Sequence, residues 1–434
     1  MTRTIVVCLL SNRPAAASAI AAAFVVLAMT VGFAPSSAAQ EQEGAEAGSP
    51  EPAGPSWSDH ATGDWFGVRA ELLRKGVAVD IALQADHSTN LAGGLRRGSV
   101  LRRPAALALS IETAPLLGWK GGLFHATFQI HEGRHGTEAL VGDAQGFDNV
   151  DARRFRQLSE LWFEQTLFRE RLRLRIGKLD ANSDFATVEN GSEFLNSSAG
   201  FSPTIQGFPS YPDPATGVSA FVSPSQWLYA GAGVYDGATH EGCHGRTGSR
   251  GPATLWGDPR ALFLIGEAGL QWKVRGQRAG RVGAGAWRHT GSFERFDGGR
   301  GDGAAGSYVV LEQDVWRESA SAGGEQGLAA FAQLGRANGE VSEIDQHVGL
   351  GLAWSGAIPG RDLDVLGAMV SSVRFTDAPQ AGCLRRRETA LEVFYRIQLL
   401  PWVGVTSDLQ YIAAPGVGGA RPALVWTVRA QVAL

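Results

Sequence analysis

The sequence predicts an all-β fold: a sixteen-stranded antiparallel transmembrane β-barrel (an outer-membrane barrel) with a short N-terminal helix on the periplasmic side. Three observations predict it. Segments of about ten residues that alternate apolar and polar side chains recur along the chain, as in barrel strands of the outer membrane. The links between these segments alternate between short and long, and the chain begins with a secretory signal.

Alternation is clearest in "VAVDIALQAD" (77–86), "LFHATFQIH" (123–131), "ETALEVFYRIQLL" (388–400) and the C-terminal "LVWTVRAQVAL" (424–434). Successive side chains of a strand point to opposite faces, so each segment forms a strand with one apolar and one polar wall. Sixteen candidate strands begin near residues 77, 105, 123, 158, 172, 218, 227, 261, 281, 307, 327, 347, 364, 389, 403 and 423.

The segment "RLRLRIGKLD" (171–180) raises the question of which wall faces inward, because three arginines alternate with two leucines and an isoleucine. A soluble half-buried strand, the commoner arrangement, turns its leucines inward. A membrane barrel turns them toward lipid and the arginines toward a wet lumen.

Link lengths decide between these two arrangements. Outer-membrane barrels have short periplasmic turns and longer extracellular loops, and a soluble sandwich has no reason to segregate its links in this way. The arginines are therefore expected to face the lumen, and about sixteen strands enclose an aqueous channel. The short links are 169–171, 223–226, 275–280 and 358–362, and the long ones are 132–157, 181–217, 236–260 and 374–387.

The N-terminal segment is expected to direct export rather than to fold. Arg3 and Arg13 precede an apolar run, and small residues follow it, so residues 1–39 form a signal peptide cleaved after Ala39. Residues 40–60 are acidic and rich in Gly and Pro, which is typical of a disordered linker. The barrel then spans 61–434, and its location is the outer membrane of a Gram-negative bacterium, in contact with membrane lipid.

Charge and cysteine content exclude several classes of protein. The formal net charge of −4 argues against a nucleic-acid partner. Beyond the signal, the chain has only Cys243 and Cys383, too few for a disulfide scaffold or a four-cysteine metal site. Both cysteines fall in predicted extracellular loops and are predicted to pair; two unpaired cysteines are the alternative.

Eight blocks make the chain similar to the carbohydrate-selective porins of the OprB family, in the same order and spacing. This resemblance implies a sixteen-stranded barrel, without a cofactor, through which monosaccharides and small oligosaccharides diffuse. It leaves open whether the chain is a monomer or a homotrimer. The last residue, Leu434, departs from the aromatic residue usual at this position. The blocks are "TGDWFGVRAELLRKGV", "LLGWKGGLFH", "LSELWFEQTLF", "LRIGKLDANSDFA", "FLNSSAGFSP", "GVYDG", "ETALEVFYRIQLLPW" and "DLQYIAAPG".

The resemblance also implies that the longest link, 181–217, folds back into the barrel and narrows it. We expect its acidic residues and the arginines of the neighbouring strand to form an eyelet that exchanges hydrogen bonds with sugar hydroxyls. For each residue alone, the alternative is a wall charge in a water-filled lumen. The predicted eyelet residues are Arg173, Arg175, Lys178, Asp184, Glu189, Glu193, Glu160 and Glu164, and the predicted sugar-contacting rings are Phe185, Phe194, Phe201 and Tyr211.

Residues 61–76 are predicted to form the short amphipathic helix, with Phe66, Leu72 and Leu73 on its apolar side. This helix is expected either to pack against the barrel or to take part in solute passage; the sequence leaves both alternatives open.

The motif "HEGRH" (131–135) matches the zinc-protease pattern, but that chemistry needs a helix, whereas His131 closes an alternating strand. No metal is therefore expected. An outer-membrane enzyme, a lipase or protease, is the competing function. Such enzymes need a Ser/His or Asp/His constellation, and the nine histidines are scattered along the chain.

Overall fold

The structure, a computed structural model, describes residues 60–237, 247–256, 260–274, 278–318, 326–378, 385–416 and 419–434. All of them fall within one compact unit, Gly54–Leu434. The predicted signal peptide, the linker up to residue 59, Cys243 and Cys383 lie outside the described residues, so these expectations stay predictions.

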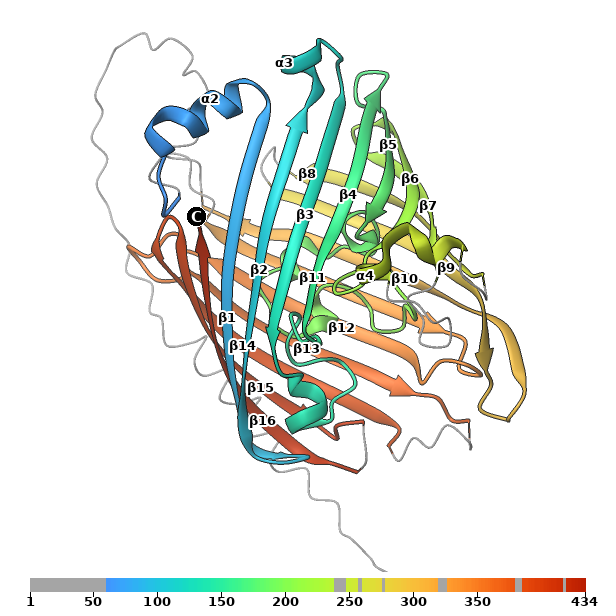
Figure 1. The fold of residues 1–434 in the computed structure, drawn as a ribbon. Helices are drawn as coiled ribbons and strands as arrows, with labels where there is room; N and C mark the ends of the chain where they lie inside the picture. The colour runs from blue at the N-terminus through green and yellow to red at the C-terminus, as the bar shows by residue number, and fades with distance from the viewer. Residues whose placement is uncertain are drawn as a thin grey trace, which may run out of the picture. The chain divides into compact units, whose positions relative to one another are not determined.

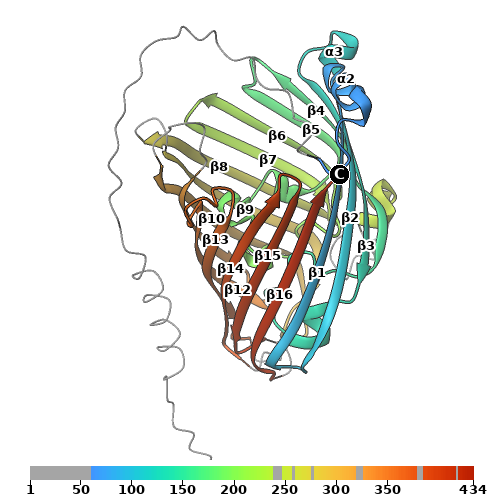
Figure 2. The same cartoon turned by 90° about the vertical axis from the view of Figure 1, so that its left-hand side faces the viewer.

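The described strands close into a single barrel in which each strand pairs antiparallel with its neighbours in the chain and the first pairs with the last (Figures 1 and 2). The predicted sixteen-stranded antiparallel barrel is confirmed. The strands are β1 (Val77–Gly94), β2 (Gly98–Glu112), β3 (Gly122–Gly133), β4 (Phe155–Leu167), β5 (Leu172–Leu179), β6 (Ala215–Ser225), β7 (Leu228–Asp236), β8 (Leu262–Val274), β9 (Arg278–Glu294), β10 (Arg300–Arg317), β11 (Gly327–Ala337), β12 (Ile344–Ser355), β13 (Val365–Phe375), β14 (Arg387–Leu400), β15 (Val403–Ala413) and β16 (Arg421–Ala433).

Two strand starts and the link pattern need correction. β2 begins at Gly98 and β10 at Arg300, whereas the predicted starts were 105 and 307. The early parts of both strands lack a continuous apolar face, because charged residues and glycines interrupt the alternation. The links 295–299 and 338–343 are short although they lie at the end of the barrel that carries the longer loops.

We call the end that carries α2 (Val68–Arg74), α3 (Thr113–Leu117) and the C-terminus the terminal end, and the opposite one the loop end (Figure 1). Outer-membrane barrels place their longer loops outside the cell. The loop end is therefore expected to be extracellular and the terminal end periplasmic.

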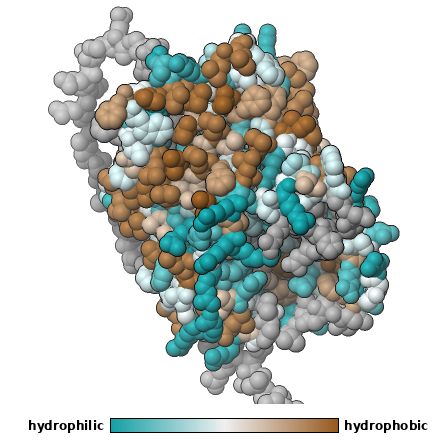
Figure 3. Space-filling view, in the orientation of Figure 1, coloured by the Kyte–Doolittle hydropathy of each residue, from teal (hydrophilic) through white to brown (hydrophobic). Residues whose placement is uncertain are grey.

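The barrel is apolar outside and polar inside. On β5, Leu174 and Ile176 are exposed by 36% and 58%, whereas the Arg175 side chain between them is exposed by only 16%. The same inversion holds on β12, where Leu350 is exposed and His347 is buried. Exposed leucines, valines and phenylalanines of successive strands form a hydrophobic outer surface, seen in part in Figure 3. This confirms that Arg173 and Arg175 of "RLRLRIG" face the lumen, whereas Arg171 lies in the exposed turn before β5.

The N-terminal helix is shorter than predicted. A 3₁₀ turn (Trp65–Gly67) precedes α2, and Phe66 is fully exposed, so it does not belong to a packed apolar side. The contact with the barrel is polar: the Arg69 side chain stacks on Trp65 and donates a hydrogen bond to the carbonyl of Leu434 (3.0 Å). Within the part of the chain that is described, no helix is long and apolar enough to cross a membrane.

The link 134–154 between β3 and β4 also folds inward, which the sequence did not lead us to expect. Its Asp148 pairs with Arg102 of β2 (2.7 Å) and with Arg429 of β16 (3.2 Å). Arg429 also pairs with Asp86 of β1 (2.8 Å), and these four side chains are almost completely buried. Since leaving a buried charge without its partner is costly, this network holds the link against the strands that close the barrel.

A buried carboxylate on β14 holds the same link from the other side. Glu388 accepts hydrogen bonds from the backbone N–H groups of Ala144 (2.8 Å), Gln145 (3.1 Å) and Gly416 (2.7 Å). Asp143 lies next to this group and is buried. The link 134–154 is therefore a fixed part of the lumen wall.

Substitution of a lipid-facing residue by arginine tests whether the outer surface of the barrel faces the hydrocarbon of the membrane. Leu350→Arg places a charge halfway along β12, facing the hydrocarbon. We expect it to lower the free energy of unfolding by about 2–4 kcal/mol, measured by urea titration of the protein in lipid bilayers. Gln84→Arg, on the lumen side of β1, is the matched control and should change it little. Equal losses for the two variants would contradict the assignment of the two faces.

Asp143 predicts a pH dependence of stability. Burial, and then the nearby Glu388 carboxyl, raise the pKa of Asp143 to about 8. The unfolded chain loses this proton near pH 4 and the folded chain keeps it. Stability should therefore fall as the pH rises from about 4 to about 8, and level off above that.

The variant Asp143→Asn has no carboxyl group at this position, so it should not lose stability between pH 4 and pH 8 for this reason. Its apparent Tm should exceed that of the wild type at pH 8 and equal it at pH 4. Asp377→Asn, which removes an exposed loop carboxylate, should leave the difference between the two pH values unchanged. Identical Tm values of Asp143→Asn and the wild type at pH 8 would show that the pKa of Asp143 is not raised in the folded protein.

Candidate functional site

The link between β5 and β6, residues 180–214, crosses the lumen and is the predicted in-folded loop; we call it the inner loop. The predicted range, 181–217, ended three residues too late, because β6 begins at Ala215. Two short 3₁₀ turns, Glu189–Gly191 and Ser197–Ala199, shape its middle part. Apart from such short turns, the inner loop contains no helix and no strand.

Carboxylates of the wall bind the backbone of the inner loop at successive points. Glu267 of β8 accepts from the N–H of Ala186 (2.9 Å), and Glu312 of β10 accepts from the N–H of Asn190 (2.7 Å). Glu392 of β14 accepts from Leu195 (2.6 Å) and Asn196 (3.0 Å). A loop inside a barrel needs partners for its N–H groups, and charge-assisted bonds to carboxylates are strong ones.

Two phenylalanines of the inner loop, Phe185 and Phe194, pack against aromatic rings of the barrel wall. Phe194 packs edge-on between Phe331 of β11 (5.6 Å between ring centroids) and Phe394 of β14 (4.8 Å). These wall rings lie flat over Gly351 and Gly367, where a Cβ atom would come within 2.2 Å of them. Glycine on the neighbouring strand thus leaves the space that the rings, and between them Phe194, occupy.

Phe185 has the same role at the start of the inner loop. It packs on Phe221 of β6 (4.9 Å) and against Tyr235 of β7 (6.5 Å). Phe185 and Phe194 are exposed by 0% and 1%. The prediction that these two rings contact sugars is therefore wrong for this arrangement, because burial against the wall leaves them no surface open to a solute.

Arg173 and Arg175 of β5 form an ion-pair cluster with one wall and one loop carboxylate; of the predicted eyelet residues, Glu164 and Asp184 belong to it. Arg175 lies 2.6 Å from Glu164 and 2.9 Å from Asp184, and Arg173 lies 2.8 Å from Asp184. Arg175 stacks on Trp162 and Arg173 on Phe221. Stacking and pairing hold both guanidinium groups, while part of each side chain stays exposed.

A second cluster, centred on Arg281 of β9, was missed by the sequence reasoning. Arg281 pairs with Glu312 (2.6 Å), contacts Glu267 (3.5 Å) and donates to the Tyr229 hydroxyl (3.1 Å). It also donates to the carbonyl of Thr187 of the inner loop. Arg281 alternates with Gly283 and Gly285 on the lumen face, so the period-two argument used for Arg173 could have found it.

A single ion pair, Glu193 with Arg396, joins the inner loop to the wall at a third place. Glu193 lies 3.0 Å from Arg396 of β14, which also donates to Gln398. Glu193 was predicted to face Arg173 and Arg175, but the structure pairs it with an arginine of another strand. Arg396 was not among the predicted residues, although "VFYRIQ" shows the same alternation.

The remaining predicted polar residues have different positions. Glu189 is exposed at the turn of the inner loop. Lys178 is buried and donates to the carbonyls of Leu158 and Gly248, both at 2.5 Å, so it does not face a solute. Glu160 accepts a hydrogen bond from the indole of Trp162 (3.0 Å). Lys178 and Glu160 thus support the wall around the first cluster rather than lining an eyelet.

The other two predicted sugar-contacting residues, Phe201 and Tyr211, lie in the second half of the inner loop. The Tyr211 hydroxyl donates to the carbonyl of Val150 (3.1 Å) and contacts His131 (3.1 Å), while Phe201 packs edge-on against Phe208 (5.1 Å). His131 belongs to β3, so "HEGRH" is not helical. Among the described residues, no three or more His, Cys, Asp or Glu side chains are grouped so as to hold a metal ion.

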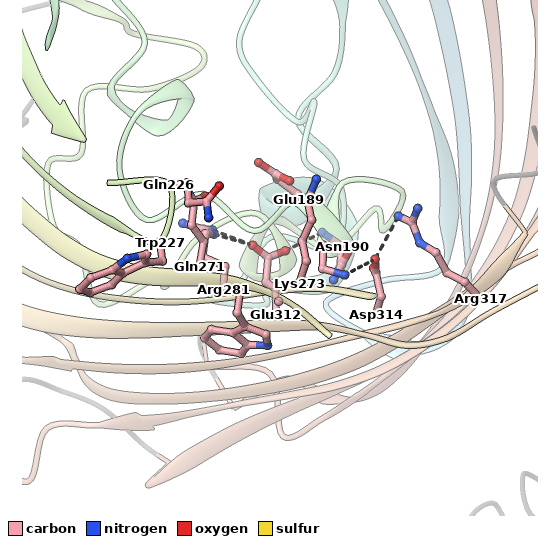
Figure 4. Close-up of a pocket in the computed structure, with 13 residues that line it drawn as sticks. Glu189, Asn190, Gln226, Trp227, Gln271, Lys273, Arg281, Glu312, Asp314 and Arg317 are labelled. Carbon is pink, nitrogen blue, oxygen red and sulfur yellow. Dashed lines mark hydrogen bonds and ion pairs between the residues drawn. The ribbon is translucent and has the colours of Figure 1, made fainter. Parts of the chain in front are cut away.

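A cavity of about 830 Å³ lies between the turn of the inner loop and strands β8 to β10. Figure 4 shows Asn190 of the loop joined by a hydrogen bond to Glu312 of the wall, which in turn contacts Arg281; these residues line the cavity together with Glu189. Lys273, Asp314 and Arg317 extend it along the wall. Its lining carries hydrogen-bonding groups of both charges, which suits a polar, uncharged solute.

Comparisons with known proteins agree with this geometry. The model of the family described as "Carbohydrate-selective porin, OprB family" matches residues 103–434. Porin B of Pseudomonas aeruginosa is 24% identical over 424 residues, which cover 85% of this chain and 90% of that protein.

Two solved structures share the fold. The high-pH structure of Pseudomonas putida OprB is similar with a TM-score of 0.76 at 21% identity, covering 88% of this chain and 99% of that one. The low-pH structure has a TM-score of 0.59 at 19% identity, covering 88% and 100%. Because the family model covers more than half of the sequence and the barrel has the matching fold, the chain belongs to the carbohydrate-selective porins of the OprB family and is an outer-membrane channel for carbohydrates.

Proposed function

We propose that monosaccharides and small oligosaccharides cross this channel by passive diffusion through an eyelet between the inner loop and the wall. Its wall side consists of Arg173, Arg175 and Arg281, and its loop side of Asp184 and Glu189. One observation carries this assignment: the three arginines are each paired with a carboxylate, yet keep 16–29% of their side-chain surface exposed.

Paired charges give the eyelet its preference for neutral polar solutes. Each guanidinium has five N–H donors, and its carboxylate partners occupy only some of them. A sugar hydroxyl both donates and accepts, so it can exchange hydrogen bonds with arginine and carboxylate alike while it loses water. Because positive and negative groups lie within 3 Å of each other, the net field on a charged solute is small.

The cavity below the turn of the inner loop receives the solute on the periplasmic side. Its volume of about 830 Å³ exceeds what one sugar ring needs. Polar side chains such as Lys273 and Asp314 line this cavity and offer further hydrogen-bond donors and acceptors beyond those of the eyelet. A sugar leaving the constriction thus regains hydrogen bonds before it reaches bulk water.

We also propose that the chain catalyses no covalent reaction. Membership in a family of channels supports this. Lipase and protease assays on the purified protein in detergent should give no turnover above a denatured control, whereas liposomes that contain the protein should swell with glucose.

Removal of one eyelet arginine should weaken sugar binding in the channel. Arg175→Ala removes charged hydrogen bonds worth about 1.5–3 kcal/mol, so the sugar concentration that half-blocks the ion current should rise about tenfold to a hundredfold. Planar-bilayer recordings with glucose and maltose measure this. Arg171→Ala, in the exposed turn before β5, is the control and should behave as wild type. Unchanged conductance and unchanged sugar block in Arg175→Ala would remove Arg175 from the eyelet.

The carboxylate that joins loop and wall should set the rigidity of the eyelet. Glu312→Ala leaves the N–H of Asn190 without its acceptor and removes the closest carboxylate of Arg281, which should weaken docking of the inner loop by about 2–3 kcal/mol. Single-channel currents should become larger and noisier, and Glu312→Gln should give an intermediate effect. Glu318→Gln, on the exposed terminal-end link, serves as control. Quiet wild-type currents in Glu312→Ala would contradict this role.

A further inference from the structure

Arginines gather on the outer surface of the barrel, away from the lumen, where β2, β3 and β4 reach the loop end. We call this group, Arg103, Arg154 and Arg156 with Glu132, the arginine patch. All three arginines are exposed, and the side chains of Arg154 and Arg156 are exposed by 70%. The channel does not use these residues, since their side chains do not line the lumen.

The patch has an excess of positive charge. Glu132 lies 3.0 Å from Arg156 and 3.7 Å from Arg154, and it stands directly opposite Arg103 in the β2–β3 pairing. One carboxylate thus faces three guanidinium groups. Such an excess on an otherwise acidic chain attracts anions.

Position along the strands sets the depth of the patch in the membrane. On β4, Arg156 comes two residues before Leu158, and Leu158 pairs with Phe128 of β3; both apolar side chains are exposed toward lipid. Two residues of a strand span about 7 Å. The guanidinium groups therefore begin where the hydrophobic belt ends, and Figure 3 shows hydrophilic surface below hydrophobic surface on this face.

We propose that the arginine patch binds the phosphate groups of a phosphorylated glycolipid of the outer leaflet, the lipid A part of lipopolysaccharide. The acyl chains of this lipid would lie along Leu107, Phe124, Phe128, Leu158 and Leu161, which are exposed on the same three strands.

Arginine chemistry favours phosphate. A guanidinium binds two phosphate oxygens at once in a planar, bidentate geometry, which an ammonium group cannot do. The partner also has to present phosphate at the boundary of the hydrocarbon, and at the loop end of an outer-membrane barrel that boundary belongs to the outer leaflet. A headgroup at this depth meets charge and apolar surface together, whereas a free phosphate meets charge alone.

Native mass spectrometry of the full-length mature protein in detergent tests the proposal, with diphosphorylated lipid A and enzymatically dephosphorylated lipid A as probes. Wild type should bind the diphosphorylated form at least tenfold more tightly than the dephosphorylated form. The double variant Arg154→Gln/Arg156→Gln should lose this preference. The matched control Arg169→Gln/Arg171→Gln removes two exposed arginines from a terminal-end turn and should keep it.

Three readouts make the result decisive. Both double variants should keep the heat-modifiable migration of a folded barrel and wild-type glucose block in lipopolysaccharide-free bilayers. Displacement of lipid A by equimolar inorganic phosphate would overturn the proposal, since free phosphate would then be the ligand. It would also be overturned by equal binding of lipid A to Arg154→Gln/Arg156→Gln and wild type, or by a change of that variant in oligomeric state alone, which would make the patch a contact between copies of the chain.

Discussion

The narrowing of this channel depends on carboxylates of the barrel wall that accept hydrogen bonds from the backbone of inward-folded links. Glu267, Glu312 and Glu392 hold the inner loop, and Glu388 holds the link 134–154. A loop in a lumen has to satisfy its N–H groups away from other strands. A wall carboxylate supplies several acceptor sites at one point, so a chain segment without regular structure acquires a fixed path.

The same carboxylates also determine where the arginines lie. Glu312 binds both the N–H of Asn190 and the guanidinium of Arg281, and Asp184 of the inner loop binds both Arg173 and Arg175. Loop position and charge balance are therefore coupled: the contacts that fold the loop inward also neutralise the wall arginines. For a channel that passes carbohydrates this coupling is useful, because the groups that we propose to bind hydroxyls are held in place without leaving a net field.

Aromatic residues complete this arrangement in a way that composition alone did not reveal. The rings of Phe185 and Phe194 resemble sugar-stacking residues in the sequence, yet both are buried between the inner loop and the wall. Their apolar contacts are formed inside a polar lumen, so the barrel has a local hydrophobic core there. Burial of this core and the hydrogen bonds to the carboxylates both favour the same path of the loop.

The sequence by itself determined the strand number, the antiparallel barrel and the direction of each wall. A period of two residues assigns every side chain of a strand to one of two faces, and the alternation of short and long links decided which face is inside. It also placed Arg173, Arg175 and Asp184 together, since they lie close along the chain. Only the tertiary structure decided that Arg281 and Arg396 belong with the inner loop, that Lys178 does not, and that a second link folds inward. Contacts such as Leu195 with Glu392, 197 residues apart, follow from how loops without periodicity pack inside the closed barrel, and no local pattern encodes them.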